Sequence, residues 1–143
     1  MANEIMTVDN SMNLAQEMSA GATSMYCSLK AGTREEKARV FNASNNPAHK
    51  VGDFINKVIM VRDVLCEVIE VENQETGMPD QAIRTVLIDA NGETYQAVSQ
   101  GIFTALKKAI QMFGAPTWDE PLPCLIKQVP VGKGSMLTFD VKL

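Results

Sequence analysis

Basic and aromatic side chains are the residues of this sequence whose chemistry points to a ligand. A single strand of nucleic acid is bound by aromatic rings that stack on its bases and by lysines and arginines that contact its phosphates. Candidates of these two kinds, on predicted strands or loops, are Tyr26, Lys30, Arg62, Arg84, Tyr95, Trp118, Lys127 and Lys133. They predict a nucleic-acid interface, provided that the fold brings them together.

The aromatic candidates also have a structural interpretation. Tyr95 fits a half-buried sheet tyrosine as well as it fits a stacking platform. Trp118, in the loop APTWDEPLP, fits a lid over a helix end as well as a ring that touches a base. The phenylalanines that we expect to pack in the interior are Phe41, Phe103, Phe113 and Phe139.

The sequence carries no pattern typical of catalysis or of a bound cofactor. It has neither GxSxG nor GxxxxGK[ST], and His49 is its only histidine. Its three cysteines, Cys27, Cys66 and Cys124, are far apart and form no CxxC pair, so we expect buried thiols rather than a zinc site. We therefore expect no enzymatic activity, no cofactor, no metal and no small-molecule substrate.

Length and composition predict a single globular domain, and we expect the protein to be intracellular. The chain has 143 residues, of which 45% are hydrophobic, and no apolar run approaches the roughly 18 residues that a membrane span needs. The first residues lack the pattern of a secretory signal, so we expect a cytoplasmic protein with no membrane partner. A net charge of −4 argues against coating duplex DNA by charge alone but leaves single-strand binding open.

The order of predicted elements from residue 57 onward indicates an OB-fold. The predicted strands are 57–72, with a bend near 63–65, then 82–89, 93–98, 124–131 and 135–143, and the helix is 101–113. This predicts a mainly β protein: a five-stranded barrel with a helix between strands three and four that covers its open end. In a competing register, residues 24–31 form the first barrel strand.

The residues before 57 are expected to extend this barrel. Residues 24–31 alternate as a strand on which Tyr26 and Lys30 share a face, and the capping box of Thr33 and Glu36 predicts a helix from Arg34 to about Asn42. Residues 1–23 read as a flexible arm, and 24–143 as a single OB-fold domain. The apolar residues of the arm that have no local partner, and that we expect to dock on another copy of the chain, are Met12, Leu14 and Met18.

Three segments carry a resemblance to a known family. They are YCSLKAGTREEKARVFNASNNP, GDFINKVIMVRDV and TVLIDANGETYQAVSQGIFTALKKAIQMFG. Followed by a closing β pair, they resemble the single-stranded DNA-binding proteins of Gram-positive phages and conjugative plasmids. The resemblance implies an OB-fold that coats single-stranded DNA with little sequence preference during plasmid transfer or phage DNA replication. It also implies a homo-oligomer or filament assembled along the strand.

A second hypothesis is an assembly module that uses an OB scaffold for protein contacts and binds no nucleic acid. The net charge of −4 and the methionine-rich arm favour it. Deletion of residues 1–20 discriminates between the two, because an arm that serves only assembly leaves DNA binding in place.

Overall fold

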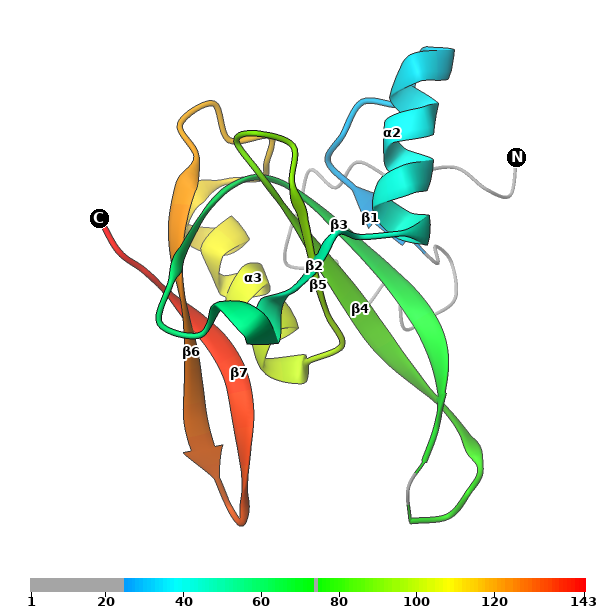
Figure 1. Ribbon diagram of the computed structural model, residues 1–143, viewed down its shortest axis with the longest axis vertical. Helices are drawn as coiled ribbons and strands as arrows, with labels where there is room; N and C mark the ends of the chain where they lie inside the picture. Colours follow the sequence, from blue (N-terminus) through cyan, green and yellow to red (C-terminus); the bar gives the residue numbers. More distant parts are fainter. Residues whose placement is uncertain (1–24, 74) are drawn as a thin grey trace.

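The computed structural model describes residues 25–73 and 75–143. These residues form one mixed β-sheet, two α-helices and one 3-10 helix (Figure 1). In chain order the elements are β1 (Met25–Cys27), α2 (Arg34–Asn45), β2 (His49–Lys50), η2 (Val51–Phe54), β3 (Val58–Glu72), β4 (Pro79–Asp89), β5 (Thr94–Ala97), α3 (Gln100–Phe113), β6 (Leu122–Val131) and β7 (Gly134–Val141).

The sheet is built around the long strand β3. Its strand order is β2-β5-β4-β3-β6-β7, and β1 pairs with β3 outside this path. Every pair is antiparallel except β2 with β5. Two long hairpins, β3–β4 and β6–β7, project on opposite sides of the view in Figure 1, with η2, β2 and β5 drawn between them. The expectation of a mainly β protein is confirmed, and the curled sheet is consistent with an OB-like barrel.

A β-bulge divides β3 into two parts. Val61 pairs with Asp89 and Asp63 pairs with Ile88, so Arg62 is the extra residue. A bulge bends a strand and increases its twist. The bend predicted near 63–65 is therefore present, slightly earlier in the chain. β3 pairs with β6 before the bulge and with β4 from Val61 onward.

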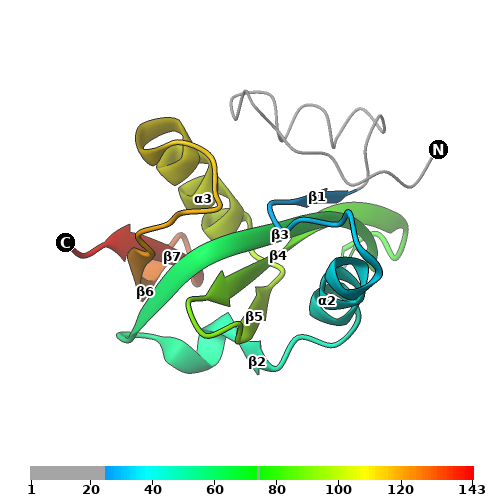
Figure 2. The same cartoon turned by 90° about the horizontal axis from the view of Figure 1, so that it is seen from above.

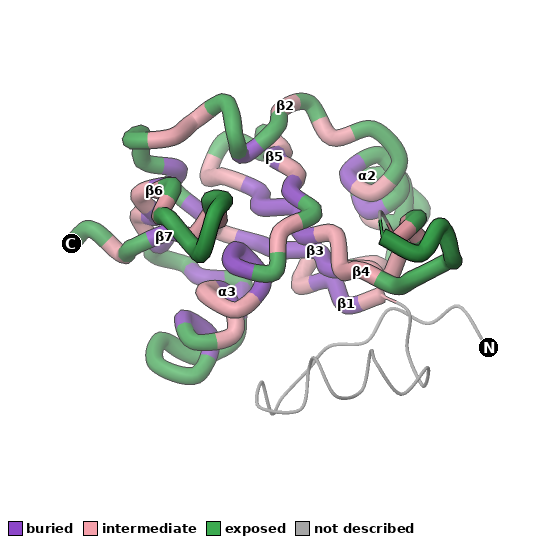
Figure 3. The backbone as a smooth tube through the Cα atoms, turned by 90° about the horizontal axis from the view of Figure 1, so that it is seen from below, coloured by how far each residue is buried: buried purple, intermediate pink, exposed green. Residues whose placement is uncertain are grey.

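After the bulge both faces of the β3–β4 pair are buried over a short stretch, which explains the apolar run from Val64 to Cys66. Alternate residues enter two separate clusters. Val64 and Cys66 pack in the cluster that includes α3, whereas Leu65 packs with Val40 and Ala43 of α2. The two helices accordingly lie on opposite faces of the sheet, as Figure 2 shows. In Figure 3 the buried residues occupy the middle of the molecule and the turn of the β6–β7 hairpin is exposed.

The capping box predicted for α2 is present, and α3 is capped as well. The Thr33 hydroxyl accepts a hydrogen bond from the Glu36 N–H and the Glu36 carboxylate accepts one from the Thr33 N–H. Ser99 caps α3, which ends at Gly114 with a φ of 87°. Gly101 is required by packing, because a Cβ there would collide with the carbonyl oxygen of Leu137 on β7.

Among the described strands, β5 does not pair with β7, so a closed five-stranded cylinder is not formed by backbone hydrogen bonds. The free edge of β5 is taken by β2, where His49 pairs with Tyr95. This two-residue strand could not be expected from the sequence, because its parallel pairing depends on where the chain returns after α2. Met12, Leu14 and Met18, and the arm as a whole, lie outside the described residues.

Candidate nucleic-acid interface

The three aromatic residues predicted to stack on bases are buried. Tyr26 is 1% exposed, Trp118 is 7% exposed and Tyr95 is 8% exposed. Tyr26 pairs with Cys66 of β3 and its ring lies in the core, while Lys30 lies outside β1, which ends at Cys27. Tyr26 and Lys30 therefore do not share a strand face, contrary to expectation. The indole N–H of Trp118 donates to the carbonyl oxygen of Gly114 at 3.0 Å, so the lid interpretation of this residue is correct.

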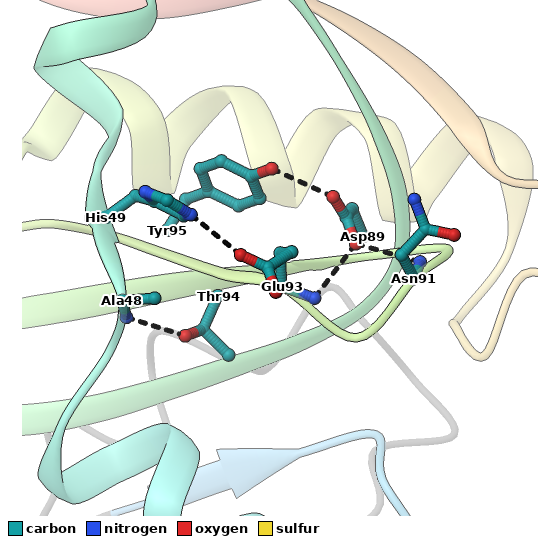
Figure 4. A network of polar contacts seen from close by, with 7 residues as sticks. All are labelled: Ala48, His49, Asp89, Asn91, Glu93, Thr94 and Tyr95. Atoms are coloured by element: carbon teal, nitrogen blue, oxygen red, sulfur yellow. Dashed lines mark hydrogen bonds and ion pairs between the residues drawn. The ribbon is translucent and has the colours of Figure 1, made fainter.

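A cluster of three rings lies where β2, η2 and β5 meet. The His49 ring stacks on Tyr95 with centroids 5.0 Å apart and planes at 27°, and Phe54 meets both rings edge-on. The side chain of His49 is 37% exposed and its Nε2 lies 2.8 Å from Glu93 Oε1 (Figure 4). His49, rather than Tyr95, is therefore the ring of this stack that solvent reaches.

Tyr95 is fixed in place by the β4–β5 turn. Its hydroxyl donates to Asp89 Oδ2 at 2.8 Å, and the other oxygen of Asp89 accepts the backbone N–H groups of Asn91 and Glu93 (Figure 4). Burial, and then the hydrogen bond to Asp89, raise the pKa of Tyr95 to about 12. The phenol thus stays neutral at physiological pH and holds the turn to the ring cluster.

Two of the predicted basic candidates are neutralised by carboxylates. Arg84 of β4 is paired with Glu67 of β3, and its guanidinium also donates to the backbone carbonyl of Ser44 in α2. Lys127 of β6 is paired with Asp140 of β7 at 2.9 Å. Arg84 is largely enclosed and ties α2 to the sheet, whereas the Lys127 side chain is 44% exposed and its pairing is a weak surface interaction.

Four lysines on β2, on the segment before β3 and on the β6–β7 hairpin make up what we call the basic strip: Lys50, Lys57, Lys127 and Lys133. The backbone brings Lys57 close to Lys127. The carbonyl oxygen of Lys57 accepts the N–H of Ile126 at 3.0 Å, next to Lys127, and Lys133 lies in the turn of the same β6–β7 hairpin. Lys50 and Lys57 were not among the sequence candidates, because the pairing of β2 with β5 and the hydrogen bond between Lys57 and Ile126 join segments far apart in the sequence.

Arg62 takes a different position from the other candidates. As the extra residue of the bulge, it lines a cleft together with Arg39 and Asn42 of α2. The cleft adjoins the ring cluster, because Thr94 also lines it and the Thr94 hydroxyl accepts the N–H of Ala48 immediately before β2 (Figure 4). The bulge could be expected from the sequence. That Arg62 and residues of α2 line the same cleft could not be expected.

Two phenylalanines expected in the interior lie at the surface. Phe41 of α2 is 64% exposed and Phe113, at the end of α3, is 44% exposed, whereas Phe103 and Phe139 are buried as expected. Only Val40 and Ala43 of α2 are buried, so the buried stripe of that helix is narrow. Phe41 follows Val40 by about 100° around the helix, which turns its ring away from the sheet.

A comparison with known families decides the class of the protein. The family model of phage single-stranded DNA-binding proteins matches residues 20–142. The chain belongs to the phi29 phage single-stranded DNA-binding protein family. Neither the comparison with curated proteins nor that with solved structures gives a match.

Membership in this family places the chain among DNA-binding proteins rather than among enzymes. Within residues 25–73 and 75–143, no three histidine, cysteine or acidic side chains gather where they could hold a metal ion. In the same part of the chain, no helix has the length and apolar character needed to cross a bilayer. The remaining question is which surface meets the strand.

Proposed function

We propose that this protein binds single-stranded DNA with little sequence preference and coats it. The observation that carries the proposal is the family match, which extends over nearly the whole described chain. The curled sheet adds support, because OB-type barrels bind oligonucleotides on the face between two long loops. In this reading β3, β4, β5, β6 and β7 are the five barrel strands, and α3 covers the end between β5 and β7.

The strand is proposed to run along the basic strip. Lys50, Lys57, Lys127 and Lys133 are basic side chains that solvent reaches, and phosphates are contacted by such side chains. Asp53 and Asp140 lie among them, and Asp140 already pairs with Lys127. DNA phosphates would replace Asp140 as the partner of Lys127, since the pair is exposed and weak.

His49 is the proposed stacking ring. It lies between the basic strip and the cleft beside α2, and Tyr95 supports it from beneath. Histidine rings stack on unpaired bases as other aromatic side chains do. This role replaces the one predicted for Tyr95, whose ring is covered. Lys30 and Arg62 are retained as phosphate contacts near α2.

The biological setting and the assembly are also proposals. We infer a role in phage DNA replication or plasmid transfer in the cytoplasm, with copies joined through residues 1–23, including Met12, Leu14 and Met18. A surface for a neighbouring copy exists around the end of α3. There the exposed apolar side chains Met60, Phe113 and Leu143 line one groove.

Fluorescence anisotropy with a labelled oligo-dT tests the DNA-binding proposal. We expect binding at low salt that weakens as salt rises, with a slope of log K against log[salt] of about −0.7 for each phosphate neutralised. Unlabelled duplex of equal length should compete poorly. No detectable binding to oligo-dT at low salt would rule out the proposal and would favour the assembly module.

Deletion of residues 1–20 tests the assembly proposal separately. Light scattering should show smaller particles for the deletion variant with and without oligo-dT, while binding of a short oligonucleotide persists. A deletion variant that assembles like the full chain would show that the contacts lie elsewhere.

A further inference from the structure

The cleft beside α2 has a volume of about 440 Å³ and is built by three separate segments. Arg39 and Asn42 line it from α2, Asn46 lines it from the C-cap directly after α2, and Arg62 lines it from the bulge of β3. The β4–β5 turn closes the third side with Gly92, whose φ is 85°. None of these segments forms the cleft without the other two.

The position of α2 determines which helix face looks into the cleft. Val40 and Ala43 pack on the sheet, and Ser44 is held by Arg84 on one side. Residues three and four apart lie on one helix face. Arg39, Asn42 and Asn46 follow that spacing and form the flank next to the buried stripe, so two amides and one guanidinium face the bulge together.

The lining combines a flat apolar floor with polar walls. Leu29, Ala43 and Ile88 supply apolar surface. Asp63 and Asp89 also line the cleft, but both already accept hydrogen bonds from the protein: Asp63 from the hydroxyls of Ser28 and Thr117, and Asp89 from the Tyr95 hydroxyl and two backbone N–H groups. Their capacity to attract a cation or to bind a donor is therefore largely used.

The two arginines keep their capacity to bind a ligand. Within the described part of the chain, no carboxylate lies within ion-pair distance of Arg39 or Arg62. The Nε atom of Arg62 is buried and has no hydrogen-bond partner. A buried donor without a partner costs free energy. Because this atom is buried, a ligand in the cleft would be bound by the other nitrogens of the Arg62 guanidinium group.

We propose that the cleft accepts one unstacked nucleotide of the bound strand and favours adenine there. Asn42 and Asn46 would read the edge of the base, its face would rest on Leu29 and Ile88, and Arg39 and Arg62 would hold the phosphate. A carboxamide matches the donor and acceptor of adenine N6 and N7. The cleft volume lies in the range of small-ligand pockets. The inference rests on the proposed function and adds a local base preference to it.

Competition between two oligonucleotides tests the inference. Labelled dT12 is displaced by unlabelled dT12 or by oligo-dT12 in which central positions are replaced by dA. The wild-type protein should bind the dA-containing strand at least about five-fold more tightly. Asn42→Ala and Asn46→Ala should remove this preference and leave dT12 binding in place. Arg62→Met should weaken both strands by the same factor.

Asn45→Ala is the matched control, because Asn45 is an exposed asparagine of the same helix and does not line the cleft. Its preference should equal that of the wild type, and thermal unfolding should confirm that all variants fold.

A wild-type protein that binds both strands equally, or an Asn42→Ala variant that keeps the preference, would overturn the inference while leaving the proposed function intact. Tight binding of free dAMP would also overturn it, since the cleft would then be a mononucleotide site. Failure to bind either strand would remove the proposed function itself.

Discussion

The two long hairpins of the molecule have the same architecture and opposite charge. Residues 64–83, which form most of β3–β4, contain five acidic residues and no lysine or arginine. The β6–β7 hairpin contains Lys127 and Lys133 and one acid, Asp140. Two hairpins flank the proposed OB-type face, and only the β6–β7 hairpin carries the positive charge that attracts phosphates. A protein of net charge −4 can therefore bind DNA through the distribution of its charges, with the strand held to one side.

Arg84 is the basic residue that follows the acidic part of the β3–β4 hairpin, which we call the acidic hairpin. Arg84→Met should destabilise the fold by about 2 kcal/mol, since Glu67 would lose its cation and Ser44 a donor in a mostly enclosed site. Urea unfolding measures the change. Arg34→Met, at an exposed position of α2, should change stability by less than about 0.5 kcal/mol. Loss of DNA affinity by Arg84→Met with stability unchanged would instead make Arg84 a DNA contact.

Reversing the charge of the basic hairpin should give the largest loss of DNA affinity. The double variant Lys127→Glu, Lys133→Glu should bind oligo-dT roughly ten-fold more weakly at low salt, and its salt slope should fall by about 1.4 for two lost phosphate contacts. Lys107→Glu, Lys108→Glu makes the same charge change on α3 and is the control. Equal losses in the two double variants would show that net charge, and not the hairpin, determines affinity.

The ring cluster between the hairpins should contribute a smaller part of the affinity. His49→Ala should weaken oligo-dT binding by about five-fold, because stacking contributes roughly 1–3 kcal/mol for each base. His49→Phe should restore most of the binding if the ring acts by stacking, and Phe113→Ala, at another partly exposed ring, should bind normally. Anisotropy titrations provide the values. Normal binding by His49→Ala would exclude this ring from the interface.

The acidic hairpin should have the smallest influence. Glu70→Lys, Glu72→Lys changes the total charge by as much as the β6–β7 reversal does, but at a tip that the strand does not reach. Affinity for oligo-dT at moderate salt should therefore rise by no more than about two-fold, because exposed charges beyond a Debye length are screened. A gain that mirrors the loss in the Lys127 and Lys133 variant would place both hairpins at equal distance from the DNA.

The sequence predicted the elements well and the accessibility of individual rings poorly. Capping residues and alternation are local signals, so α2, α3, β4 and β5 were found close to their observed positions. Alternation shows which residues of a strand share a face, but not whether another element covers that face. Tyr95 was expected at the surface as readily as in the sheet, and it is β2, formed after α2 returns to the sheet, that covers it with His49.

The parts of the site that the sequence did not reveal are those made by two distant segments. Lys57 joins Lys127 only because the chain before β3 bonds to β6. Arg62 and Arg39 line the same cleft only because α2 packs on one face of the sheet beside the bulge. The charge difference between the hairpins was present in the sequence, but the direct pairing of β3 with β6, which joins the two hairpins in one sheet, depends on the fold.

Mapping the strand on the folded protein by NMR tests the central claim most directly. Titration of oligo-dT into ¹⁵N-labelled protein should shift the backbone amide signals of Lys50, Lys57 and Lys133, while those of Glu72 and Gly77 at the acidic tip stay unchanged. Shifts concentrated in the β3–β4 tip, with the basic strip unchanged, would contradict the account.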